Sequence, residues 1–194
     1  MVAYVFDKII TQGARAGQIP GRTRQARDWF RNKARGTNVN ATRMLSGPNM
    51  TSGIEPGQMY LFNYDPKYKQ ELPYYDNFPL VFPIDTVSEG FLGLNMHYLP
   101  LRQRAVLMDS LYDLVTDQRY DDKTRIRLSY SVLKGASKFK GFKPTIKKYL
   151  NRQVQSRFLK IESVEWDIAL FLPLQNFQKA SSATVYKDSL EAMR

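Results

Sequence analysis

The spacing of apolar side chains changes along this chain, and that spacing limits the possible folds more than any other feature. Apolar residues alternate with polar or small ones over residues 59–64, 78–85 and 91–98, which predicts a strand followed by a β-hairpin. Pro79 and Pro83 occupy alternate positions of the first hairpin strand. Because proline cannot donate to a strand ladder, this strand is expected at a sheet edge or with an interruption.

After Pro100 the apolar spacing becomes helical, with matches three and four residues apart. It predicts helices over residues 101–115, 123–137 and 144–154, and then a closing strand over 164–172. Strands followed by helices and a final strand are typical of the α+β class. We therefore predict a small antiparallel sheet or partly closed barrel with a helical insertion and an extended basic N-terminal arm.

Residues 1–58 differ from the rest of the chain because glycines and prolines interrupt them and their apolar patches are short. We interpret them as an arm and residues 59–177 as the core. Residues 178–194 are interpreted as a polar tail, loosely held unless a partner covers it.

One segment of the arm, residues 23–34, has a helical pattern with Thr23 as its N-cap. It presents two aromatic rings, Trp29 and Phe30, on one face. Another face carries four arginines, Arg24, Arg27, Arg31 and Arg35. So short a helix needs a surface to dock on, either its own domain or a partner. We predict that the arm holds neighbouring subunits, with the two rings in a partner pocket.

Charge is strongly segregated along the chain, whose net charge is +11. Residues 1–50 carry nine basic and two acidic side chains, and residues 51–122 carry five basic and eleven acidic ones. Residues 123–161 carry twelve basic side chains and no acidic one. A stretch of this kind produces a directional positive field if it lies on one face, and its partner is then nucleic acid or an acidic protein surface. The alternative is that the acidic block neutralises it within the fold.

Within the acid-free block, five lysines are the predicted partner-binding residues: Lys138, Lys140, Lys143, Lys147 and Lys148. Contacts between these lysines and phosphates would be independent of base sequence and sensitive to salt. The same lysines would suit an acidic neighbouring subunit equally well, and the sequence does not separate the two.

The sequence lacks the motifs that mark common enzymes. It has no cysteine and a single histidine, His97, and neither a phosphate-binding lysine loop nor a dinucleotide-binding glycine motif. We interpret His97 as a solvent-facing or hydrogen-bonded strand residue rather than a base. Four carboxylates near aromatic residues are the best candidates for acid–base chemistry: Asp65, Glu71, Asp76 and Asp85. We predict no enzymatic activity, no cofactor, no metal, no small-molecule substrate and no membrane contact.

Aromatic residues are concentrated between residues 60 and 82, where they could form a stacking platform for single-stranded nucleic acid. However, the block that contains them is net acidic and would repel a phosphate backbone. Core and interface packing is therefore the favoured interpretation.

Several stretches of the chain resemble a known group of proteins. They lie at residues 59–67, 72–76, 78–84, 90–100, 156–162 and 165–170, with a further similarity in the helix segment 27–31. These stretches are similar to a small structural virion protein of large contractile-tailed bacteriophages. The resemblance implies a structural role in the particle, as a baseplate or tail component, a neck component, or a protector of the packaged DNA end.

Among these roles we favour an adaptor in the tail baseplate or head–tail region. An arm punctuated by glycine and proline becomes ordered when neighbouring copies clamp it, which a multi-copy assembly explains best. The expected partners are other virion structural proteins, through acidic surfaces, and packaged DNA. The protein is expected to be made in the host cytoplasm and carried in the virion. The alternative is a nucleic-acid-binding protein such as a virion DNA-end protector.

Overall fold

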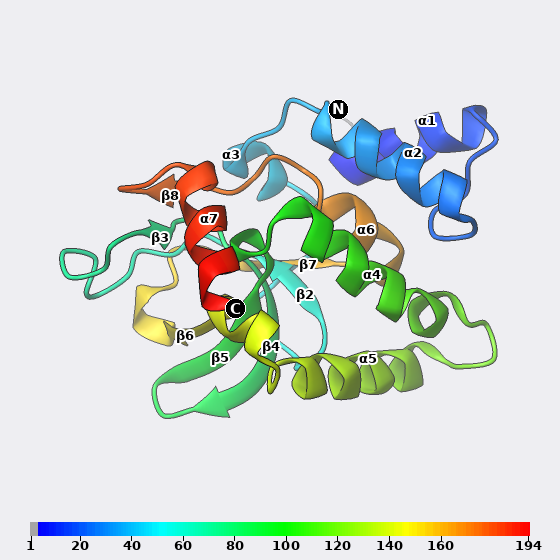
Figure 1. Ribbon diagram of the computed structural model, residues 1–194. Helices are drawn as coiled ribbons and strands as arrows, with labels where there is room; N and C mark the ends of the chain where they lie inside the picture. Colours follow the sequence, from blue (N-terminus) through cyan, green and yellow to red (C-terminus); the bar gives the residue numbers. More distant parts are fainter. Residues whose placement is uncertain (1–3) are drawn as a thin grey trace.

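The computed structural model describes residues 4–194 and contains an antiparallel sheet with the strand order β1-β7-β2-β4-β5-β6 (Figure 1). The strands are β1 (Met50–Thr51), β2 (Met59–Leu61), β4 (Leu80–Val87), β5 (Gly90–Asn95), β6 (Ile146–Leu150) and β7 (Phe158–Ile161). A second, two-stranded sheet pairs β3 (Tyr75–Asp76) with β8 (Phe177–Gln178). The predicted α+β class and the small antiparallel sheet are confirmed, and the sheet is open rather than closed into a barrel.

Helices occupy both terminal regions and the segment between β5 and β6 (Figure 1). The α-helices are α1 (Val5–Arg15), α2 (Arg24–Arg35), α3 (Ala41–Met44), α4 (Leu101–Thr116), α5 (Asp122–Ala136), α6 (Trp166–Ala169) and α7 (Ser182–Ala192). The 3-10 helices are η1 (Met96–Tyr98), η2 (Lys140–Thr145), η3 (Asn151–Gln153) and η4 (Ser163–Glu165). Across residues 4–194, no helix has both the length and the apolar character that crossing a membrane requires.

The predicted hairpin is formed by β4 and β5, with Val87 opposite Gly90 at the turn. The register shifts between Pro83 and Asp85, so the expected interruption at the proline is confirmed. The strand itself is central rather than at an edge, because β2 and β5 flank it.

The predicted helices in the regions of α2, α4 and α5 are also confirmed, and local capping explains where two of them begin. The Thr23 hydroxyl accepts the backbone N–H of Ala26 at 3.0 Å, which starts α2. The Asp121 carboxylate accepts the N–H of Thr124 at 2.7 Å, which starts α5.

The predicted helix over residues 144–154 is wrong, because the centre of this segment is the strand β6. It pairs with β5 from Leu94 opposite Ile146 to Gly90 opposite Leu150. The absence of a side chain at Gly90 lets β5 and β6 approach here, because a Cβ at this position would overlap the carbonyl oxygen of Tyr149. Pairing with a distant strand therefore overrides the helical spacing of the segment's apolar residues.

The predicted closing strand over residues 164–172 is also wrong, because η4 and α6 occupy this segment. The Glu165 side chain accepts the backbone N–H of Glu162 at 3.0 Å in a capping box, which starts a helical turn. The Trp166 indole N–H donates to the carbonyl of Ile161 at 2.9 Å and fixes the turn against β7. The strand that returns to the sheet is β7, a few residues earlier.

The large sheet is buried on both faces. Its helix-covered face belongs to a large apolar cluster that includes Leu61, Phe82 and Trp166. Its other face carries a smaller, mostly aromatic cluster: Tyr60, Phe62, Tyr64, Val81, Phe91, Tyr149 and Phe158. Core packing therefore accounts for most of the aromatic residues between 60 and 82, as expected, with Tyr68, Tyr74 and Tyr75 left incompletely buried.

The segment interpreted as an arm folds onto the core in this structure. Figure 1 shows α1 and α2 side by side at one end of the molecule, next to α6. Phe6, Ile9 and Phe30 are fully buried members of the large cluster. A Cβ on Gly13 would overlap the Phe30 ring, so glycine is what lets α1 and α2 approach so closely. The short apolar patches of this region are therefore sufficient to dock its helices.

The polar tail is folded as well. Its helix α7 buries Val185 completely. The Lys179 ammonium donates to the backbone carbonyls of Lys69, Gln70 and Leu72 at 2.6 to 3.0 Å, which ties the tail to the loop before β3. The pattern of polar residues in this segment therefore marks the exposed side of a docked helix.

Candidate nucleic-acid interface

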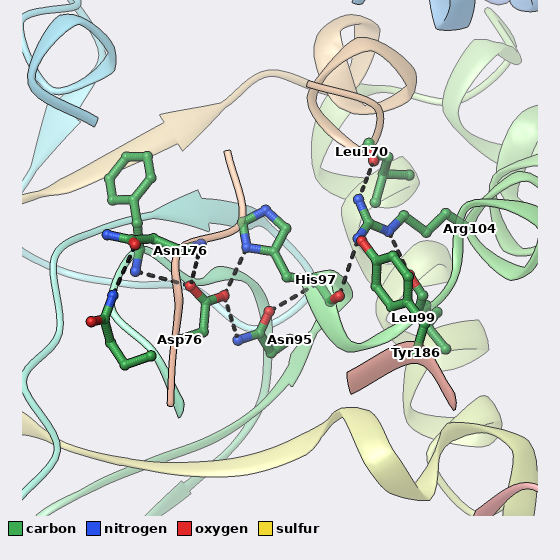
Figure 2. A network of polar contacts seen from close by, with 10 residues as sticks. Asp76, Asn95, His97, Leu99, Arg104, Leu170, Asn176 and Tyr186 are labelled. Carbon is green, nitrogen blue, oxygen red and sulfur yellow. Dashed lines mark hydrogen bonds and ion pairs between the residues drawn. The ribbon is translucent and has the colours of Figure 1, made fainter. Parts of the chain in front are cut away.

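A buried polar network connects the sheet to the helices (Figure 2). The Asp76 carboxylate lies 2.7 Å from Nδ1 of His97, and Asn95 donates its side-chain N–H to the same oxygen at 3.2 Å. Burial lowers the pKa of His97 below its ordinary value, and the nearby Arg104 charge adds to this effect. The imidazole is therefore neutral and donates its Nδ1–H to the carboxylate.

Arg104 extends this network into the helices (Figure 2). Its guanidinium is fully buried and donates to the carbonyls of Leu99 and Leu170, each at 2.7 Å. Its third and fourth bonds go to the His97 carbonyl at 3.1 Å and to the Tyr186 hydroxyl at 2.9 Å. This arginine therefore joins α4 to three other parts of the chain: η1, the end of α6, and α7.

The same network does not form an open catalytic site. The side chains of His97 and Asp76 are 0% and 1% exposed, so the pair is closed to solvent in this conformation. His97 is hydrogen-bonded, which was one of the two expectations, but it lies in η1 rather than on a strand. Of the other three carboxylate candidates, Asp65 and Asp85 form ion pairs with lysines at the surface, and Glu71 is exposed. The geometry assigns Asp76 and His97 to holding the fold together.

The predicted arginines of α2 divide into two pairs. Arg27 and Arg31 both contact the Asp109 carboxylate, at 2.9 and 2.8 Å, and Arg31 also contacts Asp167 at 2.8 Å. These two therefore fasten α2 to α4 and α6. Arg24 and Arg35 remain exposed.

The two predicted anchor rings of α2 are occupied by the chain itself. Phe30 is 1% exposed and belongs to the large cluster. Trp29 is half-buried, packs against the same cluster, and meets the Phe30 ring edge-on at 4.9 Å. In this conformation neither ring projects into solvent as a partner anchor.

The predicted lysines lie in one continuous segment, residues 138–148, which runs from the end of α5 through η2 into β6; we call it the lysine segment. Lys138, Lys140, Lys143 and Lys148 are exposed, and Lys147 is half-buried. Among residues 4–194, none of these five ammonium groups forms an ion pair.

Several acids of residues 51–122, in contrast, are paired with cations outside the lysine segment. Asp85 pairs with Lys134 at 2.8 Å, Asp117 with Arg119 and Asp122 with Arg125. Only the first and last of these pairs involve cations of the acid-free block. The lysine segment therefore keeps its charge for an external anion.

A cavity of about 450 Å³ lies where β6 meets the loop before β3. Its walls include six tyrosines, so we call it the tyrosine pocket: Tyr64, Tyr68, Tyr74, Tyr75, Tyr98 and Tyr149. The Lys147 ammonium lies 4.0 Å from the centre of the Tyr98 ring. Burial lowers the pKa of Lys147 to about 8.

The tyrosine pocket was not found by sequence reasoning. Its tyrosines are spaced like the buried aromatics of the same region, and its cation comes from a strand about 70 residues further on. The signal that could have found it is the incomplete alternation around Tyr68, Tyr74 and Tyr75, which breaks the strand pattern of their neighbours.

Comparison with known proteins identifies a family. A family model described as phage T4 terminal DNA protecting protein matches residues 6–189 of the chain. No curated protein and no solved structure matches the chain.

Proposed function

We propose, because the chain belongs to the phage T4 terminal DNA protecting protein family, that it binds the ends of phage DNA and shields them. The family supports a phage protein, as the resemblance implied, and it favours the DNA-end alternative over the baseplate, tail or neck adaptor. Protection of this kind requires only occupation of the end, with no catalytic step, cofactor or metal. The protein is proposed to act on packaged DNA in the virion.

The observation that carries this proposal is the unpaired charge of the lysine segment. Its five ammonium groups have no acidic partner within residues 4–194, and the ion pairs of the described residues are all made by other side chains. Flexible, exposed lysines contact phosphates without reading bases, and each contact releases counterions. Such binding suits a protein that must accept a DNA end whatever its sequence.

The test compares two triple charge reversals with the same change in net charge. One variant carries Lys138→Glu, Lys140→Glu and Lys143→Glu in the lysine segment. The matched control carries Lys8→Glu, Arg15→Glu and Lys33→Glu on exposed positions of α1 and α2. Binding to linear duplex DNA is measured as a function of salt, together with the resistance of the DNA ends to an exonuclease.

The first variant is expected to reduce both affinity and protection, and to lower the salt slope by about 0.9 for each phosphate that is no longer neutralised. The control is expected to keep most of the slope. Equal reductions in both variants would mean that net charge, not the lysine segment, drives binding. Absence of DNA binding by the wild-type protein at low salt would refute the proposal.

A second candidate function, attachment to another structural protein of the particle, is favoured by an apolar groove between α4 and α5. Val106 and Phe139 flank it and are 65% and 69% exposed. We propose that these side chains contact a virion protein. Replacing both with serine is expected to reduce incorporation into particles while leaving DNA affinity unchanged, and normal incorporation would exclude this role.

A further inference from the structure

We propose that the tyrosine pocket holds an unpaired terminal nucleotide of the DNA, with the base against the tyrosine rings and a phosphate at Lys147. This inference rests on the proposed function and names the part of the DNA that the site takes.

The dimensions and walls of the pocket fit a nucleotide. Its volume of about 450 Å³ lies within the range of roughly 300–1,000 Å³ typical of small-molecule sites. Tyr74 and Tyr75 are half-buried, and Tyr68 at the mouth is 54% exposed, so ring surface remains available to a ligand. Aromatic faces accept any base, because every base has a π-face.

Lys147 supplies the charge that a phosphate needs. Lys147 and Lys148 are neighbours on β6, so their side chains point to opposite sides of the sheet. Their partners on β5 are Gly93 and Leu92. Lys147 lies on the aromatic side of the sheet, and Lys148 is exposed. Within residues 4–194, the Lys147 ammonium has the Tyr98 ring as its cation–π partner and no carboxylate beside it. Burial already lowers its pKa, and an anion beside it would offset that cost.

The acidic groups at the pocket do not cancel this charge. Two acidic side chains, Asp76 and Glu89, line the pocket together with three lysines, Lys67, Lys147 and Lys148. The lining side chains therefore carry a net positive charge.

An aromatic pocket distinguishes a DNA end from the rest of the duplex. Within a duplex, both faces of each base are stacked on neighbours, and extruding an internal nucleotide costs unstacking and unpairing energy. A nucleotide in a frayed or overhanging end has little of this cost. The pocket would thus give end preference, while the exposed lysines give general affinity for the backbone.

The experiment measures end preference, which is the ratio of the protein's affinities for two DNAs of equal length. One DNA has open ends that carry a short single-stranded overhang, and the other has both ends closed by hairpin loops. The full-length chain is compared with Lys147→Gln and Tyr74→Ala. The matched controls are Tyr120→Ala, between α4 and α5, and Lys123→Gln, in the first turn of α5. Thermal unfolding checks that each variant is folded.

A second measurement does not depend on any variant. A DNA carrying 5-iodouracil at the terminal nucleotide is irradiated with the wild-type protein, and the attached peptide is identified by mass spectrometry. The same base at an internal position is the comparison. Attachment to residues 64–76, 98 or 146–150 from the terminal position is expected.

In the pocket variants we expect end preference to fall at least about fivefold, the lower range for removal of one base–aromatic stack, while affinity for the closed DNA changes little. The controls should keep the wild-type ratio. If wild-type protein prefers open ends, but the pocket variants keep that preference and the terminal base attaches elsewhere, the pocket inference is wrong and the proposed function stands. If wild-type protein binds neither DNA, both fail.

Discussion

Replacing Asp76 with asparagine should cost the protein a large part of its stability. In the wild-type protein, Oδ1 accepts the backbone N–H groups of Phe78 and Asn176 at 3.0 and 3.2 Å. Oδ2 accepts from His97 at 2.7 Å and from Asn95 at 3.2 Å. An asparagine side chain has one acceptor oxygen and one NH₂ group, so in either orientation one pair of donors faces another donor.

The magnitude follows from the number of donors left without an acceptor. Each buried polar group without a partner costs about 1–3 kcal/mol, so two such groups cost about 2–6 kcal/mol. A change of tautomer at His97 would let Nδ1 accept from the new amide N–H, but it would place an N–H donor on Nε2, which is buried and has no partner within residues 4–194. The Asn95 amide would still lack its acceptor, so two buried donors would remain unsatisfied.

The assay is urea unfolding at pH 7 of the wild type, Asp76→Asn and the surface control Asp65→Asn. The control removes an exposed ion pair with Lys69 and should leave the unfolding midpoint unchanged. Burial alone would raise the pKa of Asp76, but its hydrogen bonds and His97 hold it below the ordinary value of 3.8. Its contribution is therefore present at pH 7 and is lost only as pH falls through the lowered folded pKa. A destabilisation below about 1 kcal/mol with an unchanged m value would refute the reasoning.

Two further predictions concern the packing of the helices around α1 and α6. Burial raises the pKa of Glu165 from 4.5, the value expected in the unfolded chain, to about 7. The free energy of unfolding of the wild type should therefore fall by at most about 3 kcal/mol as pH rises from 4.5 through 7. Glu165→Gln keeps an acceptor for the Glu162 N–H and should flatten that profile; an unchanged slope would contradict the assignment. Gly13→Ala should destabilise by about 1–3 kcal/mol in thermal unfolding through its clash with Phe30, whereas Gly141→Ala, with open space at its Cβ, should not.

Sequence reasoning succeeded where local signals determine the structure. Thr23 and Asp121 cap their helices through hydrogen bonds three residues away, and the β4–β5 hairpin closes over two residues. It failed at β6, because the partner strand of Ile146 and Leu150 lies more than 50 residues earlier in the chain. Non-local pairing leaves no mark on the spacing of apolar residues within the segment itself.

The same distinction explains what was predicted of the site. The lysine segment is visible in the sequence, since it lies inside a block with no acid. The tyrosine pocket is not, because a charge balance summed over residues 51–122 counts acids that never reach the tyrosines. Asp109, for example, pairs with Arg27 and Arg31 on α2. Electrostatic fields act over distances in space, and here the fold sorts those acids away from the aromatic residues.

The position of β6 at the sheet edge offers another explanation for its two lysines, and the burial pattern decides between them. Charged residues on an edge strand prevent pairing with other chains, and exposed Lys148 fits that role. A lysine that only blocks association keeps its ammonium group in water, where it loses no hydration. Lys147 instead lies half-buried against Tyr98 with a lowered pKa, a placement that costs stability in the free protein. An anionic ligand in the tyrosine pocket would offset that cost, and protection of edges would not.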